Sequence, residues 1–505
     1  MNHKLPRVAL AIAGLLLFAL TILRAVESWS NDSHLDHVAG IWVAHAIDLT
    51  HGTFYRPATG PYGYGGTRYF PLFFCLHALA IKLFGGWRAT GYALSTASIV
   101  LLLAAVYYLL LRIRASRWLA LAGCLAVLAG SSVQGALLTI REDAMAAMLN
   151  AWGVAFCAGE DSSPRRLHYA AALFALAFAV KETTIFGVAT VCLAFLLSNR
   201  TRSALRLLKL TSIGYGLILA GIYFGSGGRA FEVFRLTAAT GVGLHSLLLS
   251  PSTFVSVMRL DGDLGETILL GLAAASLLTA GTRNVRRIPP LLFLCTLAVT
   301  VVIFSSEGID DNHLIDLHVA AVVLLVDWAL RTDLPEFAIS ASTIACFIVC
   351  LALVADAEQG SPDTEPNRAQ LEQVVHAIGT VERPILAETP LLPILAGQQP
   401  YLLDPFSFRV MVEKKPSLAE PMWQMLRERR FAAVVLLHDP HSDEGREFYA
   451  STHFGVEFAE RLDRDYELAA IPGRKYLYLP RVQSLTKQGP NDLIGHPAGA
   501  STRQK

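Results

Sequence analysis

The chain has 505 residues, of which 53% are hydrophobic and only 16% are charged, whereas soluble domains have about 25% charged residues. The net charge of +1 gives no electrostatic reason to expect a nucleic-acid partner. All seven cysteines fall within apolar segments, so neither a disulfide framework nor a cysteine-based zinc site is predicted. This composition indicates a polytopic membrane protein.

The first apolar segment runs from Val8 to Leu23 and follows the basic residues Lys4 and Arg7. This order resembles a signal sequence, but the small residues of a cleavage site do not follow it. We therefore expect a retained membrane anchor with its N-terminus in the cytoplasm.

A helix needs about 17 to 25 predominantly apolar residues to cross the hydrocarbon core of a membrane. We expect eleven such segments, near residues 8–24, 89–111, 117–139, 142–159, 167–181, 183–198, 208–225, 264–281, 288–304, 314–330 and 336–355. With the N-terminus inside, the arginine-rich connections all fall on the cytoplasmic side, as the positive-inside rule favours.

Residues 69–87 are also apolar enough to cross, but a span there would invert every later segment. Pro71, His77 and Lys82 interrupt this stretch, so we expect a helix that lies in or dips into the outer interface. A twelfth span is the alternative.

The three large outer regions are then 25–88, 226–263 and 356–505. The first contains an amphipathic stretch from Asp36 to Leu49, and residues 1–355 form the membrane domain. Beyond a polar linker, helical patterns and β-like runs predict a small periplasmic α/β domain over 356–483. Its elements are expected at 369–379, 385–387, 401–403, 421–430 and 432–437. Residues 484–505 resemble a disordered tail.

Charged residues gather at the outer ends of the apolar segments. The groups are Asp32 with Asp36, then Arg141-Glu142-Asp143, then Lys181-Glu182, and finally Glu307 with Asp310-Asp311-Asn312-His313. A charge at a bilayer centre is unfavourable by roughly 2.5 to 3.5 kcal/mol on insertion scales, so these positions serve either solvation or function.

Each group has a structural and a functional interpretation. Asp32 could cap a helix that starts near Ser33, or an acid there could serve as a general base. Asp143 could complement the dipole of the helix that follows it. Lys181 could extend its ammonium to the interface, or it could bind a phosphate.

The acidic run before the tenth span is the candidate metal site. Glu307, Asp310 and Asp311 have carboxylates of the kind that bind Mg²⁺ or Mn²⁺. Their spacing matches no defined metal motif. A divalent cation is therefore the one cofactor that the sequence suggests, and His313 is equally suited to contact a phosphate or a hydroxyl.

Five short motifs appear in an order that resembles the GT-C superfamily of polytopic glycosyltransferases, which includes lipid-A aminoarabinose transferases and protein O-mannosyltransferases. They are Asp36 eight residues before Ala44 with Gly52-Thr53-Phe54-Tyr55 following, Tyr69-Phe70-Pro71-Leu72, Arg141-Glu142-Asp143, Lys181, and Asn312-His313-Leu314-Ile315. The resemblance covers residues 8–355. His37 and Phe70 depart from the family pattern, which often has Glu and Pro there.

The resemblance implies an all-α membrane bundle and a role for each motif. Asp36 would be the base that deprotonates the acceptor hydroxyl, with Asp32 as the second candidate, and Asp143 would position the acceptor or the donor. Lys181 and His313 would contact the lipid-linked phosphate. The remaining members of the implied substrate site are Arg141, Glu142, Asn312 and Tyr69.

The resemblance implies an inverting glycosyltransferase of the bacterial inner membrane. Its donor would be a polyprenyl-phosphate-linked sugar, and its acceptor a lipid, a glycan or a protein on the periplasmic side. No dinucleotide or P-loop motif is present. The alternative is a transporter or lipid flippase, for which we would expect broken helices and ionisable residues near the middle of the membrane.

Overall fold

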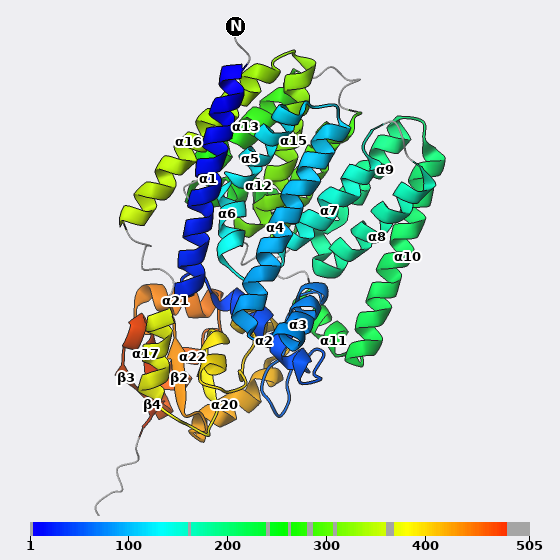
Figure 1. Cartoon of the computed structure of the whole chain (residues 1–505). Coiled ribbons are helices and arrows are strands. Elements are labelled where there is room, and N and C mark those ends of the chain that lie inside the picture. The colour runs from blue at the N-terminus through cyan, green and yellow to red at the C-terminus, as the bar shows by residue number, and fades with distance from the viewer. Residues whose placement is uncertain are drawn as a thin grey trace, which may run out of the picture.

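Long apolar helices pack side by side into a bundle, and a small mixed domain covers one end of it (Figure 1). This computed structural model describes residues 4–159, 163–238, 243–260, 264–279, 286–306, 311–359 and 368–481. The predicted tail at 484–505 lies outside the described residues.

The bundle contains most of the helices. In chain order they are α1 (Lys4–Asn31), α4 (Trp87–Arg112), α5 (Arg117–Leu128), α6 (Ser131–Leu138), α7 (Asp143–Cys157), α8 (Pro164–Val180), η1 (Glu182–Thr184), α9 (Ile185–Leu197), α10 (Thr201–Ser226), α12 (Leu244–Leu260), α13 (Leu264–Leu278), α14 (Ile288–Ile303), η2 (Asp311–Leu314), α15 (Ile315–Arg331) and α16 (Pro335–Gln359). Their buried faces form one large apolar core.

Five of the described helices are long and apolar enough to cross a membrane, and the pair α5–α6, bent by 65°, makes a sixth if it counts as one span. The predicted count of eleven is not confirmed, although a helix occurs in every one of the eleven segments. The difference arises because α7, α8, α9, α13 and α14 have only 13 to 17 residues. Their apolar runs in the sequence continue into the turns at their ends.

Helix α12 was not predicted, because its segment was assigned to an outer region. Pro251 lies inside the helix and interrupts the apolar run. Even so, Met258 is buried in the main core, and the rings of Phe254 and Phe304 are 5.3 Å apart. The helix therefore packs within the bundle.

Two helices of the first outer region and one later helix lie at the end of the bundle that faces the small domain (Figure 1). They are α2 (His37–Thr50), α3 (Leu72–Phe84) and α11 (Arg229–Thr237). The 13 residues of α3 span about 20 Å, less than the roughly 30 Å hydrocarbon core. Its length therefore favours the predicted interfacial helix over a twelfth span.

The small domain contains a four-stranded sheet in the order β1-β2-β4-β3. Its elements are α17 (Arg368–Ile378), β1 (Ile385–Ala387), α18 (Leu391–Leu395), α19 (Pro405–Lys414), η3 (Pro416–Ala419), α20 (Glu420–Arg427), β2 (Ala433–Leu436), α21 (Asp443–Ser451), α22 (Phe458–Asp465), β3 (Tyr466–Ala470), η4 (Pro472–Arg474) and β4 (Tyr476–Pro480). The first two strands pair in parallel, and the other two pairings are antiparallel. Strands β1 and β2 lie where the sequence predicted them, whereas β3 and β4 were missed.

The predicted strand at 401–403 is wrong, and the reason is a contact with the first outer region. Tyr64 donates its amide to the Tyr401 carbonyl at 2.7 Å and accepts from the Leu403 amide at 3.1 Å. Gly63 has φ +92°, and a Cβ there would lie 2.0 Å from the Tyr401 oxygen, so only glycine fits. The segment therefore docks the small domain onto the loop that precedes the candidate site.

Candidate functional site

Asp36 begins helix α2 and faces the bundle. Its backbone is extended (φ −79°, ψ −172°), and its carboxylate accepts a 2.8 Å hydrogen bond from the Ala39 amide. This is the geometry of an N-cap, which satisfies a backbone donor that the first helical turn leaves unpaired. The cap fixes the direction of the carboxylate.

The other oxygen of Asp36 forms an ion pair with the Arg141 guanidinium, and each of the two side chains is only 12% exposed. Arg141 comes from the short connection between α6 and α7. Burial alone would raise the pKa of Asp36, but Arg141, His37 and the Ala39 amide together hold this pKa below its usual value. Asp36 is therefore a carboxylate at neutral pH.

Asp143 holds together three segments of the bundle. It is the first residue of α7, where a negative charge interacts favourably with the helix dipole. One oxygen pairs with the Lys181 ammonium, and the other accepts a 3.0 Å hydrogen bond from Asn312 in η2. Lys181 occupies the extended break between α8 and η1 (φ −152°, ψ 122°), which turns its side chain away from the helix axis.

The remaining predicted residues surround this pair. His313 lies close enough to Lys181, Asp143 and Arg141 to interact with their charges. The Tyr69 ring packs 4.7 Å from that of Trp42, and its hydroxyl is near enough to Arg141 and Glu142 for their charges to act on it. The predicted catalytic and substrate-binding residues, apart from Asp32, therefore lie together at one end of the bundle.

Glu142 is the most unusual member of this group. Its side chain is 5% exposed, and its Oε2 atom has no hydrogen-bond partner among the described residues. A buried polar atom without a partner is rare in native proteins and is destabilising unless something else satisfies it. We interpret this oxygen as a contact that a bound molecule or water would complete.

Asp32 is set apart from the other acids. It adopts a left-handed backbone conformation (φ 51°) and pairs at 2.9 Å with Arg88. Burial raises the pKa of Asp32 above its usual value, although Arg88 acts against this shift. Asp32 thus belongs to a second ion pair and not to the pair formed by Asp36 and Arg141.

The candidate metal site lies only partly within the described residues. Glu307 and Asp310 lie outside the described residues, and of Asp311 only the backbone is described. Within the described ranges, no group of three or more His, Cys, Asp or Glu side chains is arranged to hold a metal. The predicted Mg²⁺ or Mn²⁺ site remains a prediction.

Arg68 lies beside the candidate site and was not among the predicted residues. Its guanidinium lies 4.8 Å from the centre of the Phe406 ring, and its charge acts on both His313 and Tyr69. No carboxylate of the described residues lies within ion-pairing distance of it, whereas Arg56, Arg88 and Arg141 each have one. Its presence in an outer region, against the positive-inside bias, was the available signal.

The small domain also reaches the site, which the sequence did not indicate. The ring of His453 lies 5.4 Å from that of His37, the residue after Asp36. Buried Glu388 holds His453 in place through a 2.6 Å contact with its Nδ1 atom and also accepts a 2.8 Å hydrogen bond from Tyr449. These bonds hold the pKa of Glu388 below its usual value although burial opposes the shift.

No family model and no curated protein sequence matches this chain. Solved structures do match. The oligosaccharyltransferase of Archaeoglobus fulgidus in its apo form is 13% identical, with a TM-score of 0.59 over 92% of this chain and 72% of that one. The same organism's AglB, in complex with an inhibitory peptide and a dolichol-phosphate, is 12% identical, with a TM-score of 0.56 over 90% of this chain and 72% of that one.

A second kind of enzyme matches over nearly its whole length. ArnT from Cupriavidus metallidurans, bound to undecaprenyl phosphate, is 11% identical, with a TM-score of 0.55 over 95% of this chain and 98% of that one. At such identities the similarity establishes the fold. Both kinds of neighbour have the GT-C fold that the order of the motifs predicted.

Proposed function

We propose that this chain, which has the fold of the GT-C membrane glycosyltransferases, transfers a sugar from a polyprenyl-phosphate-linked donor to a hydroxyl group of an acceptor. One observation carries the proposal. Asp36, the N-cap of α2, lies with the hydrogen-bonded group of Asp143, Lys181 and Asn312 at one end of an apolar bundle. An amphiphilic donor would place its phosphate there and its lipid against the apolar helices.

The proposed reaction is a single displacement. The acceptor oxygen forms a bond to the anomeric carbon while the bond from that carbon to the phosphate oxygen breaks. The leaving polyprenyl phosphate takes the electron pair, and the hydroxyl proton passes to the Asp36 carboxylate. Attack opposite the leaving group inverts the anomeric configuration.

Cations assist the departure of the phosphate. Lys181 is largely buried beside Asp143, and Arg68 lies near enough to His313 for its charge to act there. His313 adds an imidazole that can donate a hydrogen bond. Positioned donors in a site that excludes water stabilise a developing charge far better than water does. A phosphate stabilised in this way leaves without needing a proton.

Asp36 would act chiefly by orienting the acceptor. Because Arg141 holds its pKa low, the carboxylate is ionised at neutral pH but is a weak base. The carboxylate can accept a hydrogen bond from the acceptor hydroxyl during the whole displacement, and it takes the proton only when the bond to the anomeric carbon is nearly formed. His37 follows Asp36 in the chain, and the ring of His453 lies 5.4 Å from that of His37, so two imidazoles adjoin the proposed acceptor side.

The proposed setting is the bacterial inner membrane, with the site and the small domain on the periplasmic side. The arginine-rich turns lie at the other end of the bundle, as in the pocket of Arg112, Arg200 and Arg287. Asp36, Asp143 and Lys181 would then meet a donor in the outer leaflet, and the small domain would wall the acceptor side.

One observation favours the transporter alternative. The break between α5 and α6 lies beside a buried pair, in which His318 Nδ1 is 3.0 Å from a Glu266 oxygen. A structural role accounts for it, because Glu266 accepts hydrogen bonds from Ser131 and Ser132 at the start of α6, and His318 approaches the Ala126 carbonyl of α5 at 3.1 Å. The pair thus provides hydrogen-bond partners for polar groups at the break between α5 and α6.

Reconstitution separates the two functions. The purified chain in proteoliposomes receives an undecaprenyl-phosphate-linked sugar with its sugar radiolabelled, together with a membrane extract as the source of acceptor. We expect free undecaprenyl phosphate and labelled acceptor to appear together, and Lys181→Met to abolish both. Movement of intact donor across the bilayer, with no cleavage in any extract, would reject the transferase and favour the flippase.

A further inference from the structure

A cationic pocket lies at the end of the bundle opposite the candidate site. Helix α7 connects the two places, because it begins at Asp143 in the site and ends at Cys157 in the pocket. Its 15 residues span roughly 20 Å. The pocket is therefore a separate feature of the molecule.

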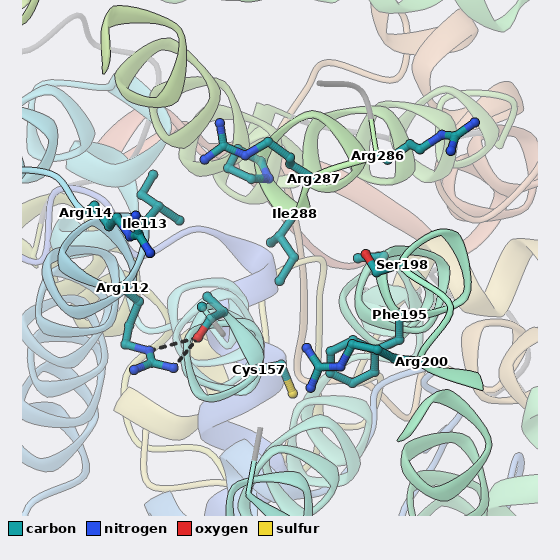
Figure 2. A pocket seen from close by; sticks show the side chains of 14 residues that line it. Arg112, Ile113, Arg114, Cys157, Phe195, Ser198, Arg200, Arg286, Arg287 and Ile288 are labelled. Carbon is teal, nitrogen blue, oxygen red and sulfur yellow. Dashed lines mark hydrogen bonds between the residues drawn. The ribbon is translucent and has the colours of Figure 1, made fainter. Parts of the chain in front are cut away.

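The cavity measures about 610 Å³ and is built from the ends of four bundle helices. Helix α4 ends there at Arg112, α7 at Cys157 and α9 just before Ser198, while α14 begins there at Ile288. Figure 2 shows Arg112 and Arg200 on either side of Cys157, with Arg287 beyond Ile288. The cavity gathers residues that are far apart in the sequence.

Five arginines line the cavity, and none of the described lining residues is acidic. They are Arg112, Arg114, Arg200, Arg286 and Arg287. In Figure 2 the side chain of Arg286 extends in the opposite direction from that of Arg287, so the latter is the nearer to Arg114. Glu160 and Asp161 follow Gly159 in the sequence and lie outside the described residues.

Part of this charge has a structural use. Arg112 donates through Nε to the Ala158 carbonyl at 2.8 Å, which satisfies the end of α7. Arg287 lies 3.1 Å from Asp327, which it shares with Arg331 at 2.9 Å. The Arg200 guanidinium lies 4.4 Å from the centre of the Phe195 ring, a contact that leaves its charge in place.

The remaining charge exceeds what the surrounding backbone requires. Each of the three helix C-termini carries a partial charge of about −0.5, and the start of α14 carries about +0.5. Arg114 has a further interaction and is left out of this sum. With Asp327 shared, the other four arginines still leave a surplus of roughly two positive charges. A preference for basic residues on one side of a membrane explains arginines at this end of the bundle. It does not explain their convergence on one cavity.

We propose that this pocket binds a ligand whose phosphate groups together carry two or more negative charges. Guanidinium groups match phosphate oxygens in pairs, and several arginines around one cavity favour a phosphate over a single carboxylate. Ile113, Ile288 and Pro289 add an apolar side to the wall. The same chemistry suits the headgroup of an anionic phospholipid and a soluble diphosphate, and the experiment distinguishes the two sources.

The test uses the full chain with two probes. In one arm, inorganic pyrophosphate is titrated into detergent-solubilised protein by calorimetry. In the other, the protein is reconstituted in nanodiscs of phosphatidylcholine with cardiolipin. After the protein is extracted, native mass spectrometry identifies the lipid that stays bound to it. The variant R200Q/R287Q removes two charges of the pocket. Arg202→Gln is the matched control, since Arg202 lies near the start of α10, outside the pocket, and is exposed.

We expect the wild type and the Arg202→Gln control to bind at least one probe, and R200Q/R287Q to bind it at least ~10-fold more weakly. R200K/R287K, which keeps both charges, should retain most of the binding and thus separates lost charge from misfolding. Binding of cardiolipin alone identifies a lipid headgroup, and binding of pyrophosphate alone identifies a soluble ligand. Failure of the wild type to bind either probe, or equal binding by R200Q/R287Q and Arg202→Gln, overturns the proposal. Neither result depends on the transferase reaction at the other end of α7.

Discussion

The Asp36 carboxylate serves two partners at once, because one oxygen caps helix α2 through the Ala39 amide while the other pairs with Arg141. Asparagine also caps helices well, so Asp36→Asn removes the charge and keeps the cap. We expect transfer to fall by about 10²- to 10⁴-fold, the usual contribution of a general base. The measurement is the rate of polyprenyl phosphate release in proteoliposomes.

Asp32→Asn is the matched comparison, since it also leaves an arginine, Arg88, without its carboxylate partner. We expect it to lower the yield of folded protein but to change the rate per folded molecule much less. If Asp32→Asn abolishes transfer while Asp36→Asn does not, the roles of the two acids are reversed.

The low pKa of Asp36 predicts the pH dependence of the reaction. Because this pKa lies below the ordinary value of 3.8, the carboxylate stays ionised as the pH falls from neutrality to about 5. The acid limb of kcat/KM that belongs to Asp36 should therefore lie below pH 3.8. An acid limb near pH 6 that disappears in Asp36→Asn would contradict this assignment.

The Asp143–Lys181 pair couples stability to function, and a double-mutant cycle can separate them. Lys181→Met leaves the 2% exposed Asp143 without its cation, a change that destabilises buried pairs by about 3 to 5 kcal/mol. Adding Asp143→Asn should restore most of the melting temperature without restoring transfer. If the double variant recovers both properties, the pair is structural only.

Arg68 is expected to bind the phosphate of the donor. Removal of one charge-assisted hydrogen bond is unfavourable by about 1.5 to 3 kcal/mol, so Arg68→Gln should lower kcat/KM for the donor roughly 10- to 100-fold. Arg68→Lys should be intermediate because it keeps the charge and loses the planar geometry. Lys82→Gln on α3, an exposed cation of the same region, is the control and should change kcat/KM little.

The sequence indicated which charged residues gather in the candidate site, but not how they pair. Asp36, Arg141, Asp143 and Lys181 were each found because charges at the ends of apolar segments are conspicuous. That Asp36 would meet Arg141 while Asp32 meets Arg88 depends on how the helices turn at their ends, which the pattern of apolar residues does not specify. The contribution of His453 was out of reach, because it depends on docking of a distant domain.

The fold shows the same division. Apolar runs located every bundle helix except α12, whose internal Pro251 and polar neighbours concealed it. The number of full spans could not be predicted from those runs, because apolar residues in a turn lengthen an apolar run just as helical residues do. Strands β3 and β4 were missed because Tyr466 to Pro480 alternates only weakly. Strand β3 lies at the sheet edge, and β4 lies between β2 and β3.

The buried Glu388–His453 contact predicts how the small domain responds to acid. Since the pKa of Glu388 is held below its usual value of 4.5, its stabilising contribution is fully present above pH 4.5 and is lost as the pH falls through the lower, folded-state pKa. Hydrogen-exchange protection factors of β2 should fall in that acidic window in the wild type. In Glu388→Gln the free energy of protection of β2 at neutral pH should be lower than in the wild type by about 1 to 3 kcal/mol. It should not fall further in the acidic window. An identical pH response in both proteins would contradict the prediction.

The Glu266–His318 pair tests whether ionisable groups inside the bundle take part in function. Glu266 is 3% exposed and accepts from both Ser131 and Ser132, so Glu266→Gln should lower the melting temperature of the detergent-solubilised chain. A broken buried pair is unfavourable by about 3 to 5 kcal/mol. Because the pair lies at the helix break and not with Asp36 or Lys181, the transfer rate per folded molecule should stay within about tenfold of the wild type, a difference of 1.4 kcal/mol. A stable Glu266→Gln variant without activity would instead indicate that a proton or an ion moves through the break.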